Sequence, residues 1–514
     1  MTLLSVISIV LALNALGRSY NILAVFPFDF YSHFQLYEVI MKELIRQNHT
    51  VTVVSQYPLK KSLKNYTDIA LVNTSQGGFD IPPDGWKLKD YTEFFHILEL
   101  GQYHCEVTLK SPAFLEFLKT DEKFDLIIVE YHTGECFLGL AHKFKVPVIG
   151  IIAQPLTIWH NNKFKNPSNP SYIPNNFLSV GIPRTFVDRL KTTLLNIIYQ
   201  MFYDYYIGVK NQKAAEEVFG KDLPLLSDIS QNISLLFVNS HFSILPPTPM
   251  VPPVIEIAGV HIGRPKKLPR HIEIWINESN HGVVYFSMGS LIKVDTVSEG
   301  RRNMFINAFR RIPQRVLWKW ENGSMPDKPD NVMIEKWMPQ FDILSHPNVK
   351  AFITHGGIFG ISEALHCGVP MIIIPMFGDQ HGNAKSVEEN GGGIYLSYEN
   401  LSEEVIYDAL TTVLDPKFNM KAKAKELGAR FKDRPLPPLK TVIYWIEYVI
   451  RHKGASHLKT AAVGMPLYKY LLLDVIAFLL LFMFIFIFVV YYVTKSVLRI
   501  LLRRLSCSAK LKRN

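Results

Sequence analysis

The stretch from Trp337 to Gln380 reads WMPQFDILSHPNVKAFITHGGIFGISEALHCGVPMIIIPMFGDQ. Within it, the apolar run AFITH is followed by a Gly-Gly turn, a helical pattern and a second apolar run, PMIIIP. Strand, turn, helix and strand in this order indicate one crossover unit of a parallel sheet. The stretch therefore predicts an α/β fold, and its polar residues follow strands, where such sheets bind their ligands.

The same alternation recurs on the amino-terminal side of this stretch. It begins with NILAVF at 21–26, a helical pattern from His33 to Gln47, and TVTVVS; it returns as LIIVE at 126–130, a helical Cys136 to Phe144, and VPVIGIIA. A second series starts at VVYFSMGS and continues through VLWKW, VMIEKW, VKAFITH and PMIIIP. We expect two doubly wound, Rossmann-like α/β domains whose strand ends face a shared cleft.

The domain limits follow from length and composition. A chain of 514 residues exceeds one hydrophobic core and suggests two domains of roughly 200 residues. The proline-rich LPPTPMVPPV, at about 245–254, is the predicted linker. We expect a signal peptide at 1–17, α/β domains at 18–245 and 246–454, a juxtamembrane segment at 455–470, a transmembrane helix at 471–494 and a basic tail at 495–514.

Both ends of the chain carry targeting patterns. Leu3 to Leu13 resembles the apolar core of a signal peptide, although a buried first strand or helix is the alternative. Val475 to Val493 carries no charge and is long enough to span a bilayer core of roughly 30 Å. The basic tail then lies in the cytosol, and both domains lie in the lumen. The lysines of the final KLKRN resemble an endoplasmic reticulum retrieval signal, or are ordinary positive-inside charge.

Charge and cysteine usage narrow the class further. The net charge of +10 is due largely to seven basic residues in the last twenty, so the rest offers no nucleic-acid-binding surface. Three of the four cysteines are lumenal: Cys105, Cys136 and Cys367. This odd set predicts buried apolar side chains, with neither a disulfide framework nor a zinc site. Seven Asn-X-Ser/Thr sequons fall on the lumenal side, at Asn48, Asn65, Asn73, Asn232, Asn277, Asn322 and Asn400.

The opening stretch also holds the parts of a nucleotide-sugar site. The His355-Gly356-Gly357 turn before a helix suits a diphosphate, because the free helix amides and the helix dipole favour an anion. Glu363, two turns on, can accept from ribose hydroxyls, and Trp337 and Gln340 can bind a base. Asp379 and Gln380 suit sugar hydroxyls. Taken singly, the glycine turn is more often structural, Trp337 a core residue and Asp379 a surface charge.

Together these residues, with Pro339, His346-Pro347, Thr354, Gly368, Pro370 and Pro375, resemble the signature of the membrane-bound animal UDP-glycosyltransferases. The likeness covers nearly the whole chain, including FSMGS, NSHF near Asn239 and the basic tail. It implies the GT-B fold, with acceptor bound by the first half, UDP-sugar by the second, and inversion at the anomeric carbon. It further implies that Ser287, Gly289 and Ser290 line the diphosphate, and that the protein serves detoxification in the endoplasmic reticulum membrane.

The resemblance also places the catalytic histidine of the family at His33, which follows the first strand. A general base there would take the proton of the acceptor hydroxyl. Glu130 stands where many relatives have aspartate and is the expected carboxylate partner, with Glu135 as a less favoured substitute. We expect no metal and no cofactor, since the UDP-sugar is a co-substrate and the sequence has no DxD triplet.

Several alternatives stay open at this stage. The acceptor is expected to be a small lipophilic molecule, because no motif in the first half names one. Glucose is favoured as the sugar, and glucuronic acid is the alternative. A non-catalytic, membrane-anchored ligand-binding or regulatory homologue is the competing class, supported chiefly by the glutamate at Glu130. Homo- or hetero-oligomers are possible partners.

Overall fold

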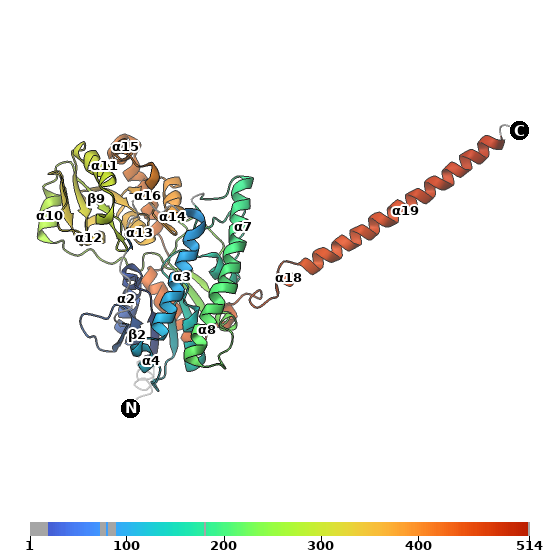
Figure 1. Cartoon of the computed structure of the whole chain (residues 1–514), viewed down its shortest axis with the longest axis horizontal. Coiled ribbons are helices and arrows are strands. Elements are labelled where there is room, and N and C mark those ends of the chain that lie inside the picture. Colours follow the sequence, from blue (N-terminus) through green and yellow to red (C-terminus); the bar gives the residue numbers. More distant parts are fainter. Residues whose placement is uncertain (1–18, 72–78, 81–88, 179–180, 512–514) are drawn as a thin grey trace, which may run out of the picture. The chain divides into compact units, whose positions relative to one another are not determined.

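The first sheet contains seven parallel strands in the order β3-β2-β1-β5-β6-β7-β8. Its strand β2 is labelled in Figure 1. Its order reverses between β1 and β5, which pair directly, so this is the switch point where open α/β sheets bind ligands. Most of these strands are apolar along their whole length because helices cover both faces. The strands are β1 (Asn21–Phe26), β2 (Thr50–Ser55), β3 (Tyr66–Ala70), β5 (Leu126–Glu130), β6 (Val148–Ile152), β7 (Leu235–Val238) and β8 (Val254–Glu256).

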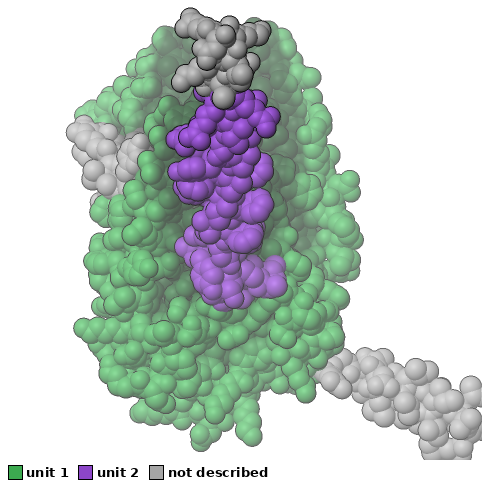
Figure 2. Space-filling view, turned by 90° about the vertical axis from the view of Figure 1, so that its right-hand side faces the viewer, with its two compact units in different colours: residues 1–459 green, residues 460–514 purple. Residues whose placement is uncertain are grey.

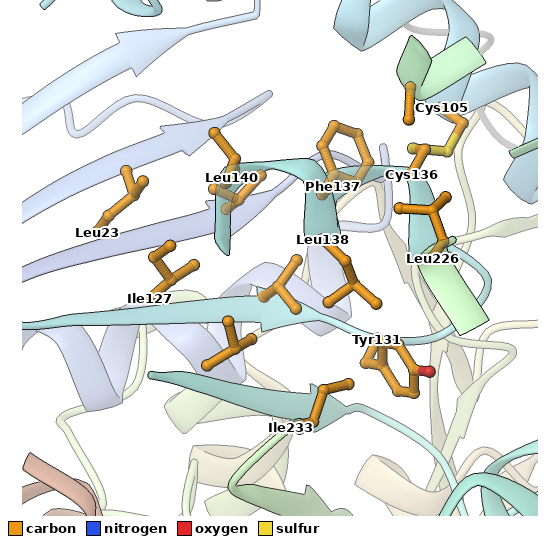
Figure 3. Packing of buried hydrophobic residues seen from close by; sticks show 14 of the residues in the cluster. Leu23, Cys105, Ile127, Tyr131, Cys136, Phe137, Leu138, Leu140, Leu226 and Ile233 are labelled. Carbon is orange, nitrogen blue, oxygen red and sulfur yellow. A yellow bond between two sulfur atoms is a disulfide. The ribbon is translucent and has the colours of Figure 1, made fainter. Parts of the chain in front are cut away.

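Alternate residues of β1 pack into two hydrophobic cores, one on each face of the sheet. Ile22, Ala24 and Phe26 pack with α2 (Tyr31–Arg46) and α17 (Pro438–Arg451) on one face of the sheet. Leu23 and Val25 face the other side, where Figure 3 shows Leu23 and Ile127 beside the segment after β5. The other helical segments of this half are α3 (Lys89–Leu109), α4 (Pro112–Phe117), η1 (Glu135–Leu138), α5 (Gly139–Phe144), α6 (Ile158–Phe164), α7 (Phe186–Phe202), η2 (Tyr203–Ile207), α8 (Gly208–Phe219) and α9 (Leu226–Ser230).

The second sheet has six parallel strands in the order β12-β11-β9-β13-β14-β15. Its switch point lies between β9 and β13, which pair from Val283 to Ser287. Its strands are β9 (Val283–Ser287), β11 (Arg315–Lys319), β12 (Val332–Glu335), β13 (Val349–Thr354), β14 (Met371–Ile373) and β15 (Gly393–Tyr395). Its helical segments are α10 (Arg270–Asn277), η3 (Val294–Thr296), α11 (Glu299–Arg310), α12 (Gln340–Leu344), α13 (Ile358–Cys367), α14 (Gln380–Glu389), η4 (Tyr398–Asn400), α15 (Glu403–Leu414), η5 (Pro416–Phe418) and α16 (Met420–Lys432).

The two halves are tied together at more than the linker. Strand β4 (Phe79–Asp80) of the first half pairs in parallel with β10 (Ile292–Lys293) of the second. After the second sheet, the chain returns to the first, where α17 packs against α2. The domain limits at 245 and 454 stay predictions; in the structure the first sheet extends to β8, which contributes Val254–Glu256.

The computed structural model describes residues 19–71, 79–80, 89–178 and 181–511, in two compact units of residues 1–459 and 460–514 (Figure 2). The predicted signal peptide, the sequon at Asn73 and Lys512 of the tail lie outside the described residues. The short η6 (Ser456–Leu458) belongs to the first unit, and the second contains α18 (Leu467–Tyr470) and α19 (Leu473–Leu511). Within α19, residues 473–505 are long and apolar enough to cross a membrane.

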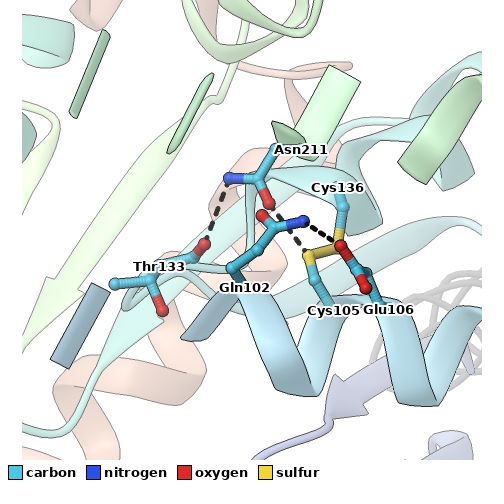
Figure 4. The surroundings of a disulfide bond; sticks show 6 residues. All are labelled: Gln102, Cys105, Glu106, Thr133, Cys136 and Asn211. Carbon is cyan, nitrogen blue, oxygen red and sulfur yellow. Dashed lines mark hydrogen bonds between the residues drawn. A yellow bond between two sulfur atoms is a disulfide. The ribbon is translucent and has the colours of Figure 1, made fainter. Parts of the chain in front are cut away.

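The sequence predicts buried cysteines and no disulfide framework; the burial is confirmed for Cys105 and Cys136, but these two side chains form a disulfide. Cys105 of α3 and Cys136 of η1 are bonded, with their Cα atoms 6.2 Å apart, and both side chains are buried (Figure 4). The two cysteines lie 31 positions apart in the sequence, so their spacing carried no signal; the packing of α3 against η1 brings them together. Cys367 is free and half-buried. The disulfide therefore joins a helix of the cavity wall to the segment that follows Glu130.

Candidate active site

The carboxyl ends of both sheets open into one cavity of about 1590 Å³. Residues after β1 line one wall, and residues after β9 and β13 line the other. The predicted residues on its surface are His33, Ser287, Gly289, Ser290, Trp337, Gln340, His355, Gly357, Glu363, Asp379 and Gln380. The structure thus brings nearly all of the sequence-predicted residues to one place.

His33 and Glu130 form a hydrogen-bonded pair at the switch point of the first sheet. His33 Nδ1 lies 2.7 Å from Glu130 Oε1. His33 stands in the first turn of α2, and Glu130 ends β5, the neighbour of β1. Glu130 is only 1% exposed, whereas His33 reaches the cavity. A carboxylate on Nδ1 fixes the tautomer that keeps the lone pair on Nε2.

The contacts around Glu130 and Glu135 show which of these two carboxylates pairs with His33. Tyr37, one turn along α2 from His33, is fully buried; its burial and then the nearby Glu130 carboxylate raise the pKa of the hydroxyl well above its ordinary value. Glu135 is engaged elsewhere, accepting from the Tyr131 hydroxyl at 2.9 Å and pairing with Lys163 at 3.3 Å. The structure therefore does not bring Glu135 to His33, and the longer side chain of Glu130 does reach the histidine.

His355, in the turn after β13, lies between two glycines: Gly357 of the same turn and Gly289 of the loop after β9. An added Cβ at Gly357 would lie 2.5 Å from His355 Nε2, and one at Gly289 would lie 2.7 Å from His355 Cε1. Gly289 also has a φ of +80°, which disfavours any other residue. Both loops thus require glycine to leave room for the imidazole. Gly356 (φ +89°) is not on the cavity surface and serves the turn itself.

Electrostatics at this turn suit an anion. Burial, followed by the charge of Lys319, lowers the pKa of His355 to about 4, so the ring is neutral near pH 7 and carries one N–H donor. Helix α13 begins at Ile358 with Gly357 as its N-cap, so its free amides and positive dipole end lie at the cavity. The turn therefore offers neutral donors where a diphosphate would place its charge.

Glu363 of α13 and Gln340 at the start of α12 form a polar pair on the cavity surface. Gln340 Nε2 donates to Glu363 Oε2 at 2.7 Å, and His261 Nε2 lies 3.6 Å from Glu363 Oε1. Burial raises the pKa of Glu363 to about 7, and the Gln340 bond opposes that shift only in part. His261 was not identified from the sequence, because it follows no recognisable motif.

Asp379 and Gln380 are fixed by their own loop. The Gln380 side-chain oxygen accepts from the backbone N–H of Met376 at 2.9 Å and of Phe377 at 3.2 Å. Asn383 donates from Nδ2 to Asp379 Oδ2 at 2.7 Å and to the Gly356 carbonyl at 3.1 Å. Asn383 thereby links this pair to the glycine turn. Its position four residues after Asp379, on one helix face, is the signal that sequence reasoning missed.

Trp337 and Lys319 complete the second wall. Trp337 is 54% exposed, so it is no core residue, and its ring packs edge-to-face with Tyr31 at 5.6 Å. Ser287 is buried and accepts from the Gly289 amide at 3.3 Å. Lys319, at the end of β11, lies almost buried on the cavity and pairs with Glu321. Its charge inside the apolar run VLWKW was a signal that the sequence reasoning passed over.

The first wall beyond His33 is aromatic. Phe28, Phe30, Tyr103, His132 and Phe177 line the cavity there. The His132 ring meets the Phe28 ring edge-on, its Nδ1 contacts the Gln154 amide, and burial holds its pKa well below its usual range. These residues come from four separate segments, so no local motif could reveal them. A flat apolar molecule with a few polar groups fits such a lining.

Two parallel α/β sheets that face each other across this cavity define a GT-B glycosyltransferase fold. The crystal structure of the glycotransferase of kitacinnamycin is similar, with a TM-score of 0.57 and 16% identity over 84% of this chain and 99% of that one. At that identity the likeness concerns the fold alone.

A model of the family described as "UDP-glucoronosyl and UDP-glucosyl transferase" matches residues 21–507, and the chain belongs to this family. It is 43% identical to UDP-glycosyltransferase UGT5 of Dactylopius coccus, over 90% of this chain and 89% of the relative. It is 38% identical to UDP-glucosyltransferase 2 of the same insect, over 93% of each. Mouse UDP-glucuronosyltransferase 1A9 is 32% identical, over 89% and 88%. The chain is therefore a UDP-glycosyltransferase.

Proposed function

We propose that the protein transfers glucose from UDP-glucose to a hydroxyl of a small lipophilic acceptor, with inversion at the anomeric carbon. The observation that carries this proposal is the 2.7 Å pair of His33 and Glu130 on the wall opposite the Trp337–Gln380 segment. A base on one wall and a leaving-group site on the other suit an in-line displacement.

In this mechanism His33 Nε2 takes the proton of the acceptor hydroxyl as its oxygen attacks the sugar carbon. The bond from that carbon to the UDP oxygen breaks, and UDP leaves from the opposite side. Glu130 stabilises the imidazolium that forms, because its carboxylate is buried and within hydrogen-bond distance of Nδ1. The same short contact argues against the non-catalytic alternative, which rested on the glutamate at this position.

Charge developing on UDP would be stabilised by the second wall, without a metal. The α13 amides, neutral His355 and the Ser287 and Ser290 hydroxyls are donors for the diphosphate, and Lys319 supplies a positive charge. Trp337 and Gln340 would bind the uracil, Glu363 the ribose, and Asp379 and Gln380 the hexose. No cofactor takes part in this scheme.

Glucose is the sugar we favour over glucuronic acid. Support comes from relatives: UDP-glucosyltransferase 2 is 38% identical over 483 residues, whereas mouse UDP-glucuronosyltransferase 1A9 is 32% identical over 478. We place the enzyme in the endoplasmic reticulum membrane, with both α/β domains in the lumen. The apolar first part of α19 and the basic residues from Lys495 onward support this orientation. Detoxification is the role that conjugation of lipophilic acceptors suggests.

A donor panel tests the proposal. Full-length protein in microsomes receives 4-nitrophenol with UDP-glucose or UDP-glucuronic acid, with and without EDTA, and the anomeric configuration of the product is read by NMR. We expect a β-glucoside, formed at an unchanged rate in EDTA. A glucuronide as the main product contradicts the sugar assignment, an α-linkage contradicts inversion, and loss of activity in EDTA contradicts metal independence. UDP binding without transfer to a broad acceptor panel would favour a regulatory role.

A further inference from the structure

Helix α7 and the turns after it present an apolar strip to solvent. Successive residues of an α-helix are 100° apart, and the seven exposed apolar residues of α7 fall within one arc of about 120°. They are Phe186, Val187, Leu190, Leu194, Ile197, Ile198 and Met201, with exposures from 45% at Leu190 to 70% at Phe186. Beyond the π-turn η2, Tyr205 and Val209 extend this strip at 77% and 62% exposure. We call these nine residues the α7 strip.

The exposure of the strip does not come from a helix that lacks a packing partner. The inner face of α7 is already packed: Tyr199 stacks on Phe94 of α3 with ring centroids 3.8 Å apart, and Thr192 and Leu195 are also buried. Figure 1 shows α7 at the edge of the first unit, with α3 beside it. An apolar face of this length on a helix that already has its packing partner marks an interaction surface.

Charges at the border of the strip suit a lipid headgroup region. Lys191 and Arg189 flank the arc on opposite sides, and each has an apolar stem from which its charge can reach a phosphate. In the structure, Arg189 Nη1 also donates to the Arg184 carbonyl at 3.1 Å. The acid of the first turn, Asp188, is occupied as the capping-box residue, accepting from Thr185 N–H at 2.9 Å. At the far end, Asp204 accepts from Gln200 at 2.7 Å.

The chain itself limits how far the strip can be from a bilayer. Only the 13 residues 460–472 separate the first unit from α19, and even fully extended they reach about 45 Å. The first unit ends where Lys459 Nζ contacts Asn232 Oδ1 at 3.2 Å, just after α9. Helix α9 packs on α8, which continues from α7 through η2. The exit point and the α7 strip therefore belong to one contiguous group of helices.

We propose that the α7 strip lies in the interfacial layer of the membrane that α19 spans, parallel to its surface. The apolar arc would enter the acyl boundary, and the flanking Lys191 and Arg189 would contact phosphates. This inference rests on membrane insertion of α19 but not on the sugar, acceptor or base assigned above. A second copy of the chain is the competing occupant of the strip.

Collisional quenching in nanodiscs tests it with the full-length chain. In a Cys367→Ala, Cys507→Ser background, which keeps the disulfide, an environment-sensitive dye is attached at Leu194→Cys. Val475→Cys within α19 is the positive control, and Val405→Cys, an exposed valine of α15, is the matched negative control. Doxyl lipids should quench the dye at 194 about threefold more than at 405.

Quenching at 194 no greater than at 405, in discs where 475 is quenched, overturns the proposal. Efficient cross-linking between two copies through the thiol of the Leu194→Cys variant, without quenching, also overturns it and points to a dimer. A Leu190→Ser, Leu194→Ser, Ile197→Ser variant should lose membrane contact at the strip but keep its turnover of 4-nitrophenol. Because turnover and quenching are read separately, failure here is distinguishable from failure of the proposed reaction.

Discussion

The two switch points of this molecule carry different chemistry with the same topology. In the first sheet, the crevice between β1 and β5 holds a histidine and its carboxylate partner, His33 and Glu130. In the second, the crevice between β9 and β13 holds backbone amides, glycines and a neutral imidazole, His355. In the proposed mechanism, the first site accepts a proton and the second stabilises negative charge. The topology fixes where a site lies, and side chains alone decide what it does.

The two sites also differ in how the chain assembles them. Ninety-seven residues separate His33 from Glu130, and a disulfide between Cys105 and Cys136 secures the segment that follows Glu130. The proposed donor site is mostly one run from Trp337 to Gln380, and Asn383 links the two ends of this run through its bonds to Asp379 and Gly356. Damage to one site should therefore leave the other largely intact.

The largest effect is expected from His33→Ala. Removal of the base should lower kcat by about 10³- to 10⁴-fold, because the acceptor hydroxyl then loses its proton only to water. The affinity for UDP, measured by calorimetry, should stay within about twofold, because none of the second-wall groups is changed. His271→Ala is the matched control: this histidine is exposed and pairs with Glu335 away from the cavity. Turnover retained by His33→Ala would remove the histidine from the mechanism.

Glu130→Gln should lower kcat by about 10²-fold, since an amide neither stabilises the imidazolium nor enforces the tautomer. UDP affinity should again be unchanged. Glu130→Asp should recover part of the rate, limited by its shorter reach. Glu135→Gln changes a second buried carboxylate of the same segment, and should affect stability without altering the pH dependence of kcat. If both glutamine variants behave alike, Glu130 has a structural role only.

Much of the fold could be predicted because its strands are continuous apolar runs. NILAVF, TVTVVS and LIIVE each form a strand with the predicted limits. The positions of the expected donor residues were equally predictable, because their spacing in one segment fixes their place on strand, turn and helix; their binding role stays a prediction. Helix α7 was not identified, because its outward face is apolar and its inward face includes Thr192. That pattern opposes the usual rule for a surface helix.

The rest depended on contacts between distant segments. The Cys105–Cys136 bond, the Gln154–His132 contact and the aromatic lining of the first wall join residues from separate elements. Asn383 and Lys319 lie close to predicted residues, but an asparagine in a helix and a lysine in a strand have many uses. Their place in the site becomes visible only when β11 and α14 are set beside the glycine turn.

Gly357→Ala should raise KM for UDP-glucose about tenfold, with a smaller effect on kcat. The new methyl would stand 2.5 Å from His355 Nε2, so the imidazole must shift from its place between the two loops. Gly300→Ala is the control, because its Cβ would meet open space in the first turn of α11. Acceptor KM should change little. An equal rise in donor and acceptor KM would show that the two sites are not separate.

The smallest effect concerns pH and Glu363. Its pKa rises on folding from 4.5 to about 7, so protonation favours the folded, ligand-free state, and this contribution is lost as pH rises through 7. Ribose binding has the opposite preference, because the carboxylate is the better acceptor. UDP affinity should therefore fall about threefold between pH 8 and pH 6 in the wild-type protein.

Glu363→Gln separates this titration from that of UDP itself, because the ligand is the same in both proteins. The variant should bind UDP more weakly than wild type at pH 8 and approach it at pH 6. Without UDP, its Tm should exceed that of wild type at pH 8 by about 1–3 °C and match it at pH 5. Calorimetry and thermal melts at the two pH values measure both. The ratio of wild-type to variant affinity for UDP should rise from pH 6 to pH 8. If it does not rise, Glu363 contacts the ribose in its protonated form.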